Sequence, residues 1–198
     1  MTFDVKPVIL TVLYAFLNTA AADEIDPCDR AAAHPSDPDR TGPGVSSADV
    51  VTHVAIPACR AAVLRDPDNP RFHYQLGRAI VYWADGNGAD GAEGVAEVRV
   101  AADMGYRQAQ FVLGFLHKRA GDICAAEPLI RAAAEQGLKS ARLTYVDDVT
   151  AGRYAGCGVS ASHDDMLGYL DGAAAQASGY YENMLLGSLR RQLLARDR

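Results

Sequence analysis

The chain lacks the clustered basic residues of a nucleic-acid-binding surface. Its 19 Lys and Arg are outnumbered by 25 Asp and Glu, which gives a formal net charge of −6, whereas binding to phosphates depends on clusters of cations. Only the tail is basic, with Arg190, Arg191, Arg196 and Arg198, and cations there complement the dipole at a helix C-terminus. We therefore expect no nucleic-acid partner.

Long apolar runs are scarce as well. The run from Pro7 to Leu17 follows Lys6 and precedes small residues at 20–22, which is the order of a secretory signal peptide. It is too short for an uncleaved anchor, because a membrane-spanning helix needs roughly 20 residues. We predict that residues 1–22 are removed before Asp23, that the mature chain has no stable membrane insertion, and that it is periplasmic or secreted.

The sequence also lacks the motifs of common catalytic sites. It has no Gly-x-Ser-x-Gly elbow, phosphate-binding loop, dinucleotide fingerprint or Ser-x-x-Lys, each of which places a nucleophile or an anion cradle at a fixed position. Cys-x-x-Cys is absent, and the five His residues show no His-Glu-x-x-His spacing. We therefore predict that the protein is not an enzyme and needs no cofactor or metal.

Two short patterns resemble metal ligands but have simpler interpretations. Asp85, Asn87 and Asp90, followed by Glu97, resemble a calcium loop with one residue too many before Gly91, and an ordinary Gly/Asp connection between helices explains the same residues. The run at 163–165, His-Asp-Asp, could supply three ligands. Acidic residues at a helix start more often favour its dipole, and we prefer that interpretation.

No segment alternates in the manner of a strand, and helical spacing recurs throughout, which predicts an all-α fold. A pattern of two alanines, a turn glycine, an alanine and a large residue occurs twice, first at 101–113 and then at 133–145. Leu76-Gly77 can be laid over Leu113-Gly114. A period in the thirties is typical of helix-hairpin repeats, so we predict an α/α solenoid of stacked antiparallel hairpins.

The remaining segments extend this array in both directions. Residues 23–46, rich in Pro and Gly, are expected to form an irregular N-terminal cap, and residues 47–198 the helical repeat domain. A capping box, Ser46-x-x-Asp49, predicts a first helix that runs to Leu64. At the other end, Ala174-Ala175 and Gly179 suggest a degenerate third copy, followed by a final helix with apolar residues four apart at 181, 185, 189 and 193.

The four cysteines form an even set in a chain that is predicted to leave the cytosol, which favours two disulfides. Three connectivities are possible, and the helix register selects one of them. Cys124 begins a helix and Cys157 follows the end of its antiparallel partner, so the two are neighbours in a hairpin. By the same logic, Cys28 before the first helix pairs with Cys59 within it.

The segments at 101–114 (AADMGYRQAQFVLG) and 133–141 (AAEQGLKSA) resemble the Sel-one-like repeat (SLR) family, a relative of the tetratricopeptide repeats. The first segment follows the A-A-x-x-G-x-x-x-A-x-x-x-L-G core throughout, and the second departs from it at Tyr145-Val146. Residues 66–79 are similar to a tetratricopeptide helix start. The resemblance implies an adaptor in protein complexes, and in bacteria many such proteins act in the envelope.

This resemblance implies protein–protein interaction as an envelope adaptor or regulator. The partner, a protein or peptide, would bind in grooves between helices. Tyr74, Arg78, Tyr106 and Arg107 are the candidate anchors, because aromatic and Arg side chains dominate binding surfaces. Tyr106 and Arg107 are expected to be the better exposed pair, and Trp83 is expected in the core. The alternative is a cell-wall-ligand-binding or β-lactamase-like hydrolase, as associated with a cysteine-rich exported SLR branch.

Overall fold

The computed structural model describes residues 25–195, so the predicted signal peptide and Arg196 and Arg198 lie outside the described residues. Within that range the chain is helical and has no strands. The helices are α1 (Pro27–Ala32), α2 (Thr52–Arg65), α3 (Pro70–Asn87), α4 (Ala92–Asp103), α5 (Arg107–Arg119), α6 (Ile123–Glu135), α7 (Lys139–Thr150), α8 (His163–Ala174) and α9 (Tyr180–Ala195).

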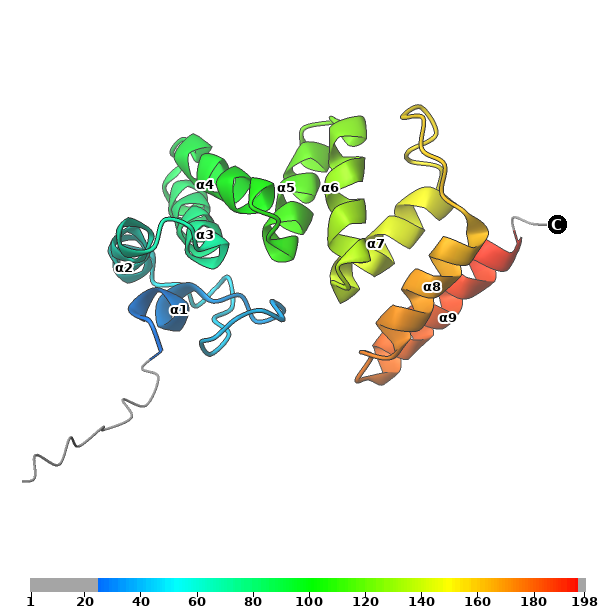
Figure 1. Ribbon diagram of the computed structural model, residues 1–198, viewed down its shortest axis with the longest axis horizontal. Coiled ribbons are helices and arrows are strands. Elements are labelled where there is room, and N and C mark those ends of the chain that lie inside the picture. Colours follow the sequence, from blue (N-terminus) through cyan, green and yellow to red (C-terminus); the bar gives the residue numbers. More distant parts are fainter. Residues whose placement is uncertain (1–24, 196–198) are drawn as a thin grey trace, which may run out of the picture.

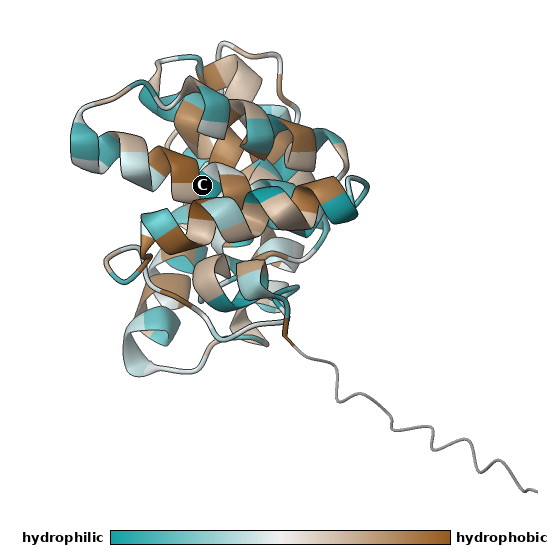
Figure 2. Cartoon of the chain, turned by 90° about the vertical axis from the view of Figure 1, so that its left-hand side faces the viewer, coloured by the Kyte–Doolittle hydropathy of each residue, from teal (hydrophilic) through white to brown (hydrophobic). Residues whose placement is uncertain are grey.

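Each helix packs against its neighbours in sequence order, which produces an elongated array with α1 and α2 at one end and α8 and α9 at the other (Figure 1). Brown apolar and teal polar segments alternate along the helices (Figure 2), as expected for helices that bury one stripe. The all-α fold is confirmed, and the arrangement is that of an α-solenoid. Among residues 25–195, no helix is both long and apolar enough to span a bilayer.

Turn glycines join the helices of each hairpin, as the repeat pattern predicted. Gly105 and Gly137 both have φ of 86°, a left-handed conformation that glycine adopts without a steric penalty. The Gly105 amide donates to Ala102 O over 3.0 Å, and the Gly137 amide donates to Ala134 O over 2.9 Å. The two copies therefore end their first helix with the same hydrogen-bonded turn.

In the third copy the alanine pair lies one residue earlier, and the turn two residues earlier, than the sequence suggested. The Ala177 amide donates to Ala174 O over 3.1 Å, so Ala177 stands where the other copies have their turn glycine. Ala173 is fully buried, whereas Ala174 and Ala175 are exposed. The predicted alignment on Ala174-Ala175 and Gly179 is wrong, because the packing requirement for a small side chain falls on Ala173.

In the two copies, the second helix of the hairpin, α5 or α7, begins with a cationic side chain that links this repeat to the next. Arg107 Nη1 donates to Gln136 O over 2.8 Å, and Lys139 Nζ donates to Gln176 O over 3.3 Å. Both cations stand two residues after the turn position, and both acceptors precede the turn of the following copy. The exposed carbonyl groups at the end of α6 and α8 are thereby satisfied.

Glycine also permits a close helix crossing, between α3 and α4. A Cβ at Gly77 would lie 2.5 Å from Gly94 O, and one at Gly94 would lie 2.7 Å from Gly77 O. The two backbones meet with no side chain between them. Gly77 belongs to the Leu-Gly pair of the repeat. At this position of the pair, glycine is required because the backbone of the neighbouring helix lies against it.

The core is divided along the array into three clusters. One joins α1, α2 and α3 through Cys28, Ala55, Cys59, Phe72 and Leu76. The second joins α3, α4 and α5 through Tyr74, Val98, Ala101, Tyr106 and Leu113. The third spans α6 to α9 and includes Ile130, Leu138, Tyr145, Met166, Leu170 and Leu189.

Three local expectations were wrong at the N-terminal end. Ser46 Oγ donates to Asp49 Oδ2 over 2.5 Å within a turn, so the first long helix begins later, at Thr52. The predicted irregular cap contains α1, which Asp26 caps by accepting from the Cys28 amide over 2.8 Å. Trp83 is 43% exposed, because the buried stripe of α3 continues from Ile80 to Ala84.

Candidate functional site

The four residues predicted to bind a partner lie together, and they contact the N-terminal part of the same chain. Tyr74, Arg78 and Tyr106 are only 1%, 4% and 8% exposed. Residues 33–45, which we call the N-terminal segment, follow α1 and lie over α3 and the start of α5. The expectation that Tyr106 is exposed is wrong, because this segment covers it.

Arg78 holds the segment through its backbone. Its Nη1 donates to Ala32 O over 2.9 Å and to Ala33 O over 3.2 Å, and its Nη2 donates to Val45 O over 2.7 Å. The guanidinium lies 5.1 Å from the centre of the Tyr82 ring, a cation–π distance. One buried cation thus satisfies carbonyl groups from both ends of the segment.

Acidic side chains hold the middle of the segment. Tyr106 Oη donates to Asp37 Oδ2 over 2.5 Å. Arg107 Nε and Nη2 donate to the two oxygens of Asp39 over 2.6 and 2.5 Å, the paired geometry that makes Arg–carboxylate contacts strong. The Tyr106 ring packs 5.7 Å from that of Tyr74.

Burial shifts the pKa of several groups in this contact. Burial raises the pKa of the Asp37 carboxyl against the opposing hydrogen bond from Tyr106. Burial and the hydrogen bond to Asp37 raise the pKa of Tyr106 well above its ordinary value. Burial and the nearby charge of Arg78 lower the pKa of His34 to about 4, and its Nδ1 accepts from the Ser36 amide over 3.1 Å.

We call the surface beneath the segment the α3–α5 groove. His34 of the segment enters it, and a residual cavity of about 90 Å³ remains between the segment and the helices. The helix residues that line it are Tyr74, Arg78, Val81, Tyr82, Val98, Val112 and Leu116.

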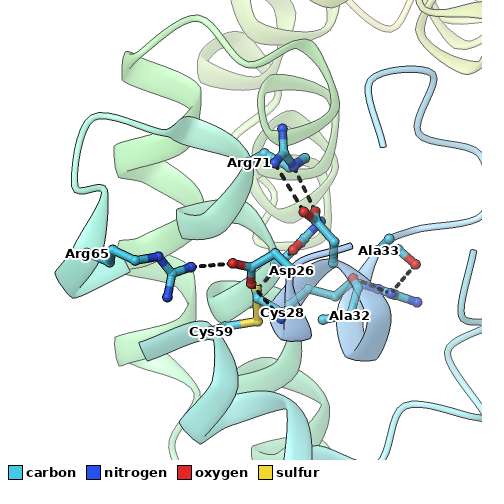
Figure 3. The surroundings of a disulfide bond; sticks show 10 residues. Asp26, Cys28, Ala32, Ala33, Cys59, Arg65 and Arg71 are labelled. Carbon is cyan, nitrogen blue, oxygen red and sulfur yellow. Dashed lines mark hydrogen bonds and ion pairs between the residues drawn. A yellow bond between two sulfur atoms is a disulfide. The ribbon is translucent and has the colours of Figure 1, made fainter. Parts of the chain in front are cut away.

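A disulfide and ion pairs anchor α1 beside this groove (Figure 3). Cys28 is bonded to Cys59 of α2. Arg71 Nε and Nη2 donate to the oxygens of Asp29 over 2.7 and 3.1 Å, and Gln75 donates to it over 2.8 Å. Burial acts to raise the pKa of Asp29, but the hydrogen bonds, chiefly from Arg71, prevail and place it below the ordinary value.

The second disulfide anchors the connection between α7 and α8. Cys124 is bonded to Cys157, so both pairs are those expected from the helix register. In the same region Asp148 is fully buried. It accepts from Lys118 Nζ over 2.5 Å, from Arg153 Nη1 over 2.7 Å and from Tyr154 Oη over 2.7 Å.

The burial of Asp37 and Asp148 could not be predicted from the sequence. Asp37 lies in a loop and Asp148 near a helix end, and each is paired with a residue far away in the chain, Asp37 with Tyr106 and Asp148 with Lys118. Only the tertiary arrangement brings these partners together. For the same reason, the sequence pattern predicted an exposed Tyr106, which is buried, whereas Arg107 remains partly exposed.

One open groove lies between α5, α7 and α9, and we call it the α5–α7 groove. Its volume is about 470 Å³. Phe115 and Leu185, which line it, are 50% and 47% exposed. Its other lining residues are Lys118, Leu143, Thr144, Asp147, Asp148, Arg153 and Leu189.

The two patterns that resembled metal ligands are used for other contacts. Glu97 Oε2 lies 2.6 Å from His73 Nδ1, so this carboxylate is paired with a histidine of α3. Ser162 caps α8 by accepting from the Asp165 amide over 3.0 Å. Within residues 25–195, no group of three or more His, Cys, Asp or Glu could hold a metal ion.

Comparison with known proteins finds no family model and no curated protein that matches the chain.

Proposed function

We propose that this protein is an exported, disulfide-stabilised SLR α-solenoid that binds a protein or peptide partner and acts as an adaptor or regulator in the envelope. The observation that carries the proposal is the α3–α5 groove, which holds a non-helical segment of chain by two backbone carbonyl groups and two carboxylates. A helix array that can hold one such segment has the surface chemistry to hold another.

Rigidity favours this function. The groove side chains lie on packed helices, so little conformational entropy is lost when they contact a ligand. Arg78 donates to backbone carbonyls of the segment, which every peptide has, whereas Arg107 and Tyr106 donate to carboxylates. The same array can therefore combine general and sequence-dependent recognition.

The disulfides fit a location outside the reducing cytosol. Cys28–Cys59 ties α1 to α2, and Cys124–Cys157 ties α6 to the connection between α7 and α8. The predicted signal peptide and these bonds are consistent with one another, and both support an envelope or secreted protein.

The test is an affinity pull-down from envelope extract with the oxidised mature chain as bait. We expect one or a few proteins to be recovered in fixed stoichiometry, and to be lost when the bait is reduced. A bait that recovers no protein but binds or turns over a chromogenic β-lactam would instead favour a small cell-wall ligand.

A further inference from the structure

The repeat register relates the open α5–α7 groove to the α3–α5 groove. When Leu76-Gly77 is laid over Leu113-Gly114, and Leu113 over Tyr145, four lining positions of one groove fall on four of the other. Arg78, Val81, Val112 and Leu116 correspond to Phe115, Lys118, Thr144 and Asp148. The two grooves are the same feature of the array, one repeat apart.

The grooves differ in what covers them. The N-terminal segment covers the first groove, and Arg78 within it is 4% exposed. At the equivalent position in the second groove, Phe115 is 50% exposed. Leu185 of α9 forms another wall and is 47% exposed. An aromatic side chain thus stands half uncovered where the preceding repeat has its segment-binding residue.

The charged side chains that line the open groove form ion pairs with one another. Lys118 and Arg153 both donate to Asp148, and Arg153 also donates to Asp147 over 2.6 Å. Since each cation already has a carboxylate, the groove offers little attraction to a charged ligand. Its apolar surface comes from Phe115, Leu143, Leu185 and Leu189.

We propose that the α5–α7 groove binds an extended segment of a partner protein that carries a large apolar side chain, which packs on Phe115. This inference rests on the proposed function, and it specifies the binding surface and the chemistry of the bound segment. The bound segment would occupy the place that residues 33–45 occupy one repeat earlier. At the first groove, backbone carbonyls of the bound segment contact Arg78. At the second groove, an apolar side chain of the partner segment would contact Phe115 instead.

The probe is a library of random linear peptides displayed on phage, selected against the oxidised mature chain. Affinities of the enriched peptides are then measured for the wild-type protein, for Phe115→Ser and for Val100→Ser. Val100 is a matched control, because it is an apolar residue of α4 that is 42% exposed and lies outside the groove. Circular dichroism and thermal unfolding establish that both variants are folded.

We expect the enriched peptides to share an aliphatic or aromatic residue and to lose about tenfold or more in affinity with Phe115→Ser, but not with Val100→Ser. Peptides that bind Phe115→Ser as tightly as wild type would overturn the groove assignment and leave the protein-binding function in place. A failure to enrich any peptide would also overturn it, and the pull-down would then decide the proposed function separately.

Discussion

At the scale of single residues, Arg78 has the largest set of contacts to the N-terminal segment. It is buried, and it donates to the carbonyl groups of Ala32, Ala33 and Val45. Replacing it with Met keeps much of the side-chain volume but removes all three hydrogen bonds, and only the Ala33 carbonyl keeps a further donor, the Val45 amide. We expect Arg78→Met to lower the free energy of unfolding by roughly 2–4 kcal/mol in chemical denaturation.

Arg60→Met is the control for this measurement. Arg60 and its partner Glu93 are both more than half exposed, at 53% and 58%, so the loss should stay below about 1 kcal/mol. Equal losses for the two variants would contradict the role assigned to Arg78.

His34 predicts a pH dependence of the same contact. Its pKa is lowered from 6.5 to about 4 by burial and by Arg78, so the unfolded chain binds more protons than the folded chain between these values. The contribution of His34 to stability is therefore present above pH 6.5 and is lost as the pH falls to about 4. We expect His34→Asn to flatten the stability curve in this range, because Asn retains an acceptor for the Ser36 amide.

Chemical denaturation at a series of pH values measures this effect. His53→Asn serves as the control, since His53 is exposed on α2 and its replacement should leave the curve unchanged. An acid limb that is identical in wild type and His34→Asn would refute the prediction.

At the scale of the helices, α3 contains a glycine that packing requires and one that it does not. Alanine at Gly77 would place its Cβ 2.5 Å from Gly94 O, whereas nothing lies within 4 Å of a Cβ at Gly86. We expect Gly77→Ala to destabilise the protein by about 1–3 kcal/mol and Gly86→Ala to stabilise it by up to about 1 kcal/mol. Thermal unfolding of the pair would refute the assignment if both changes had the same sign.

The helices and turns that were predicted correctly are those marked by a residue with its own backbone preference. Gly105 and Gly137 mark turns through their own backbone preference, so the hairpins around them were predicted correctly. The third copy has Ala177 in place of this glycine, and its turn was predicted two residues too late, at Gly179. Ser46 and Asp49 satisfied the pattern of a helix cap but form a turn with each other.

The sequence pointed to the residues of the candidate site but not to their exposure. Tyr74 and Tyr106 do pack together, with ring centres 5.7 Å apart, and Arg78, Tyr106 and Arg107 contact the same N-terminal segment. What covers them could not be predicted, since residues 33–45 have no periodicity that would fix their path. Their position depends on contacts between residues far apart in the chain, such as Asp37 with Tyr106.

At the scale of the whole molecule, the division of the core predicts that each disulfide stabilises its own end. The variant with Cys28 and Cys59 both replaced by Ser should lose about 3 kcal/mol in the N-terminal half, on the chain-entropy account. Amide hydrogen exchange should then become faster in residues 27–45 and remain unchanged in α8 and α9, which belong to a separate cluster.

The variant with Cys124 and Cys157 replaced provides the reciprocal control. Exchange should become faster in the connection between α7 and α8 and remain unchanged around α1 and α2. Equal acceleration at both ends in either variant would mean that the array unfolds as one unit.

The links from Arg107 to Gln136 O and from Lys139 to Gln176 O also bear on how such a chain can lengthen. Each repeat carries a donor for the next repeat and an acceptor for the previous one, so a tandem duplication of residues 107–138 would bring both halves of the joint with it. Gene duplication could therefore extend the superhelix without redesigning its ends.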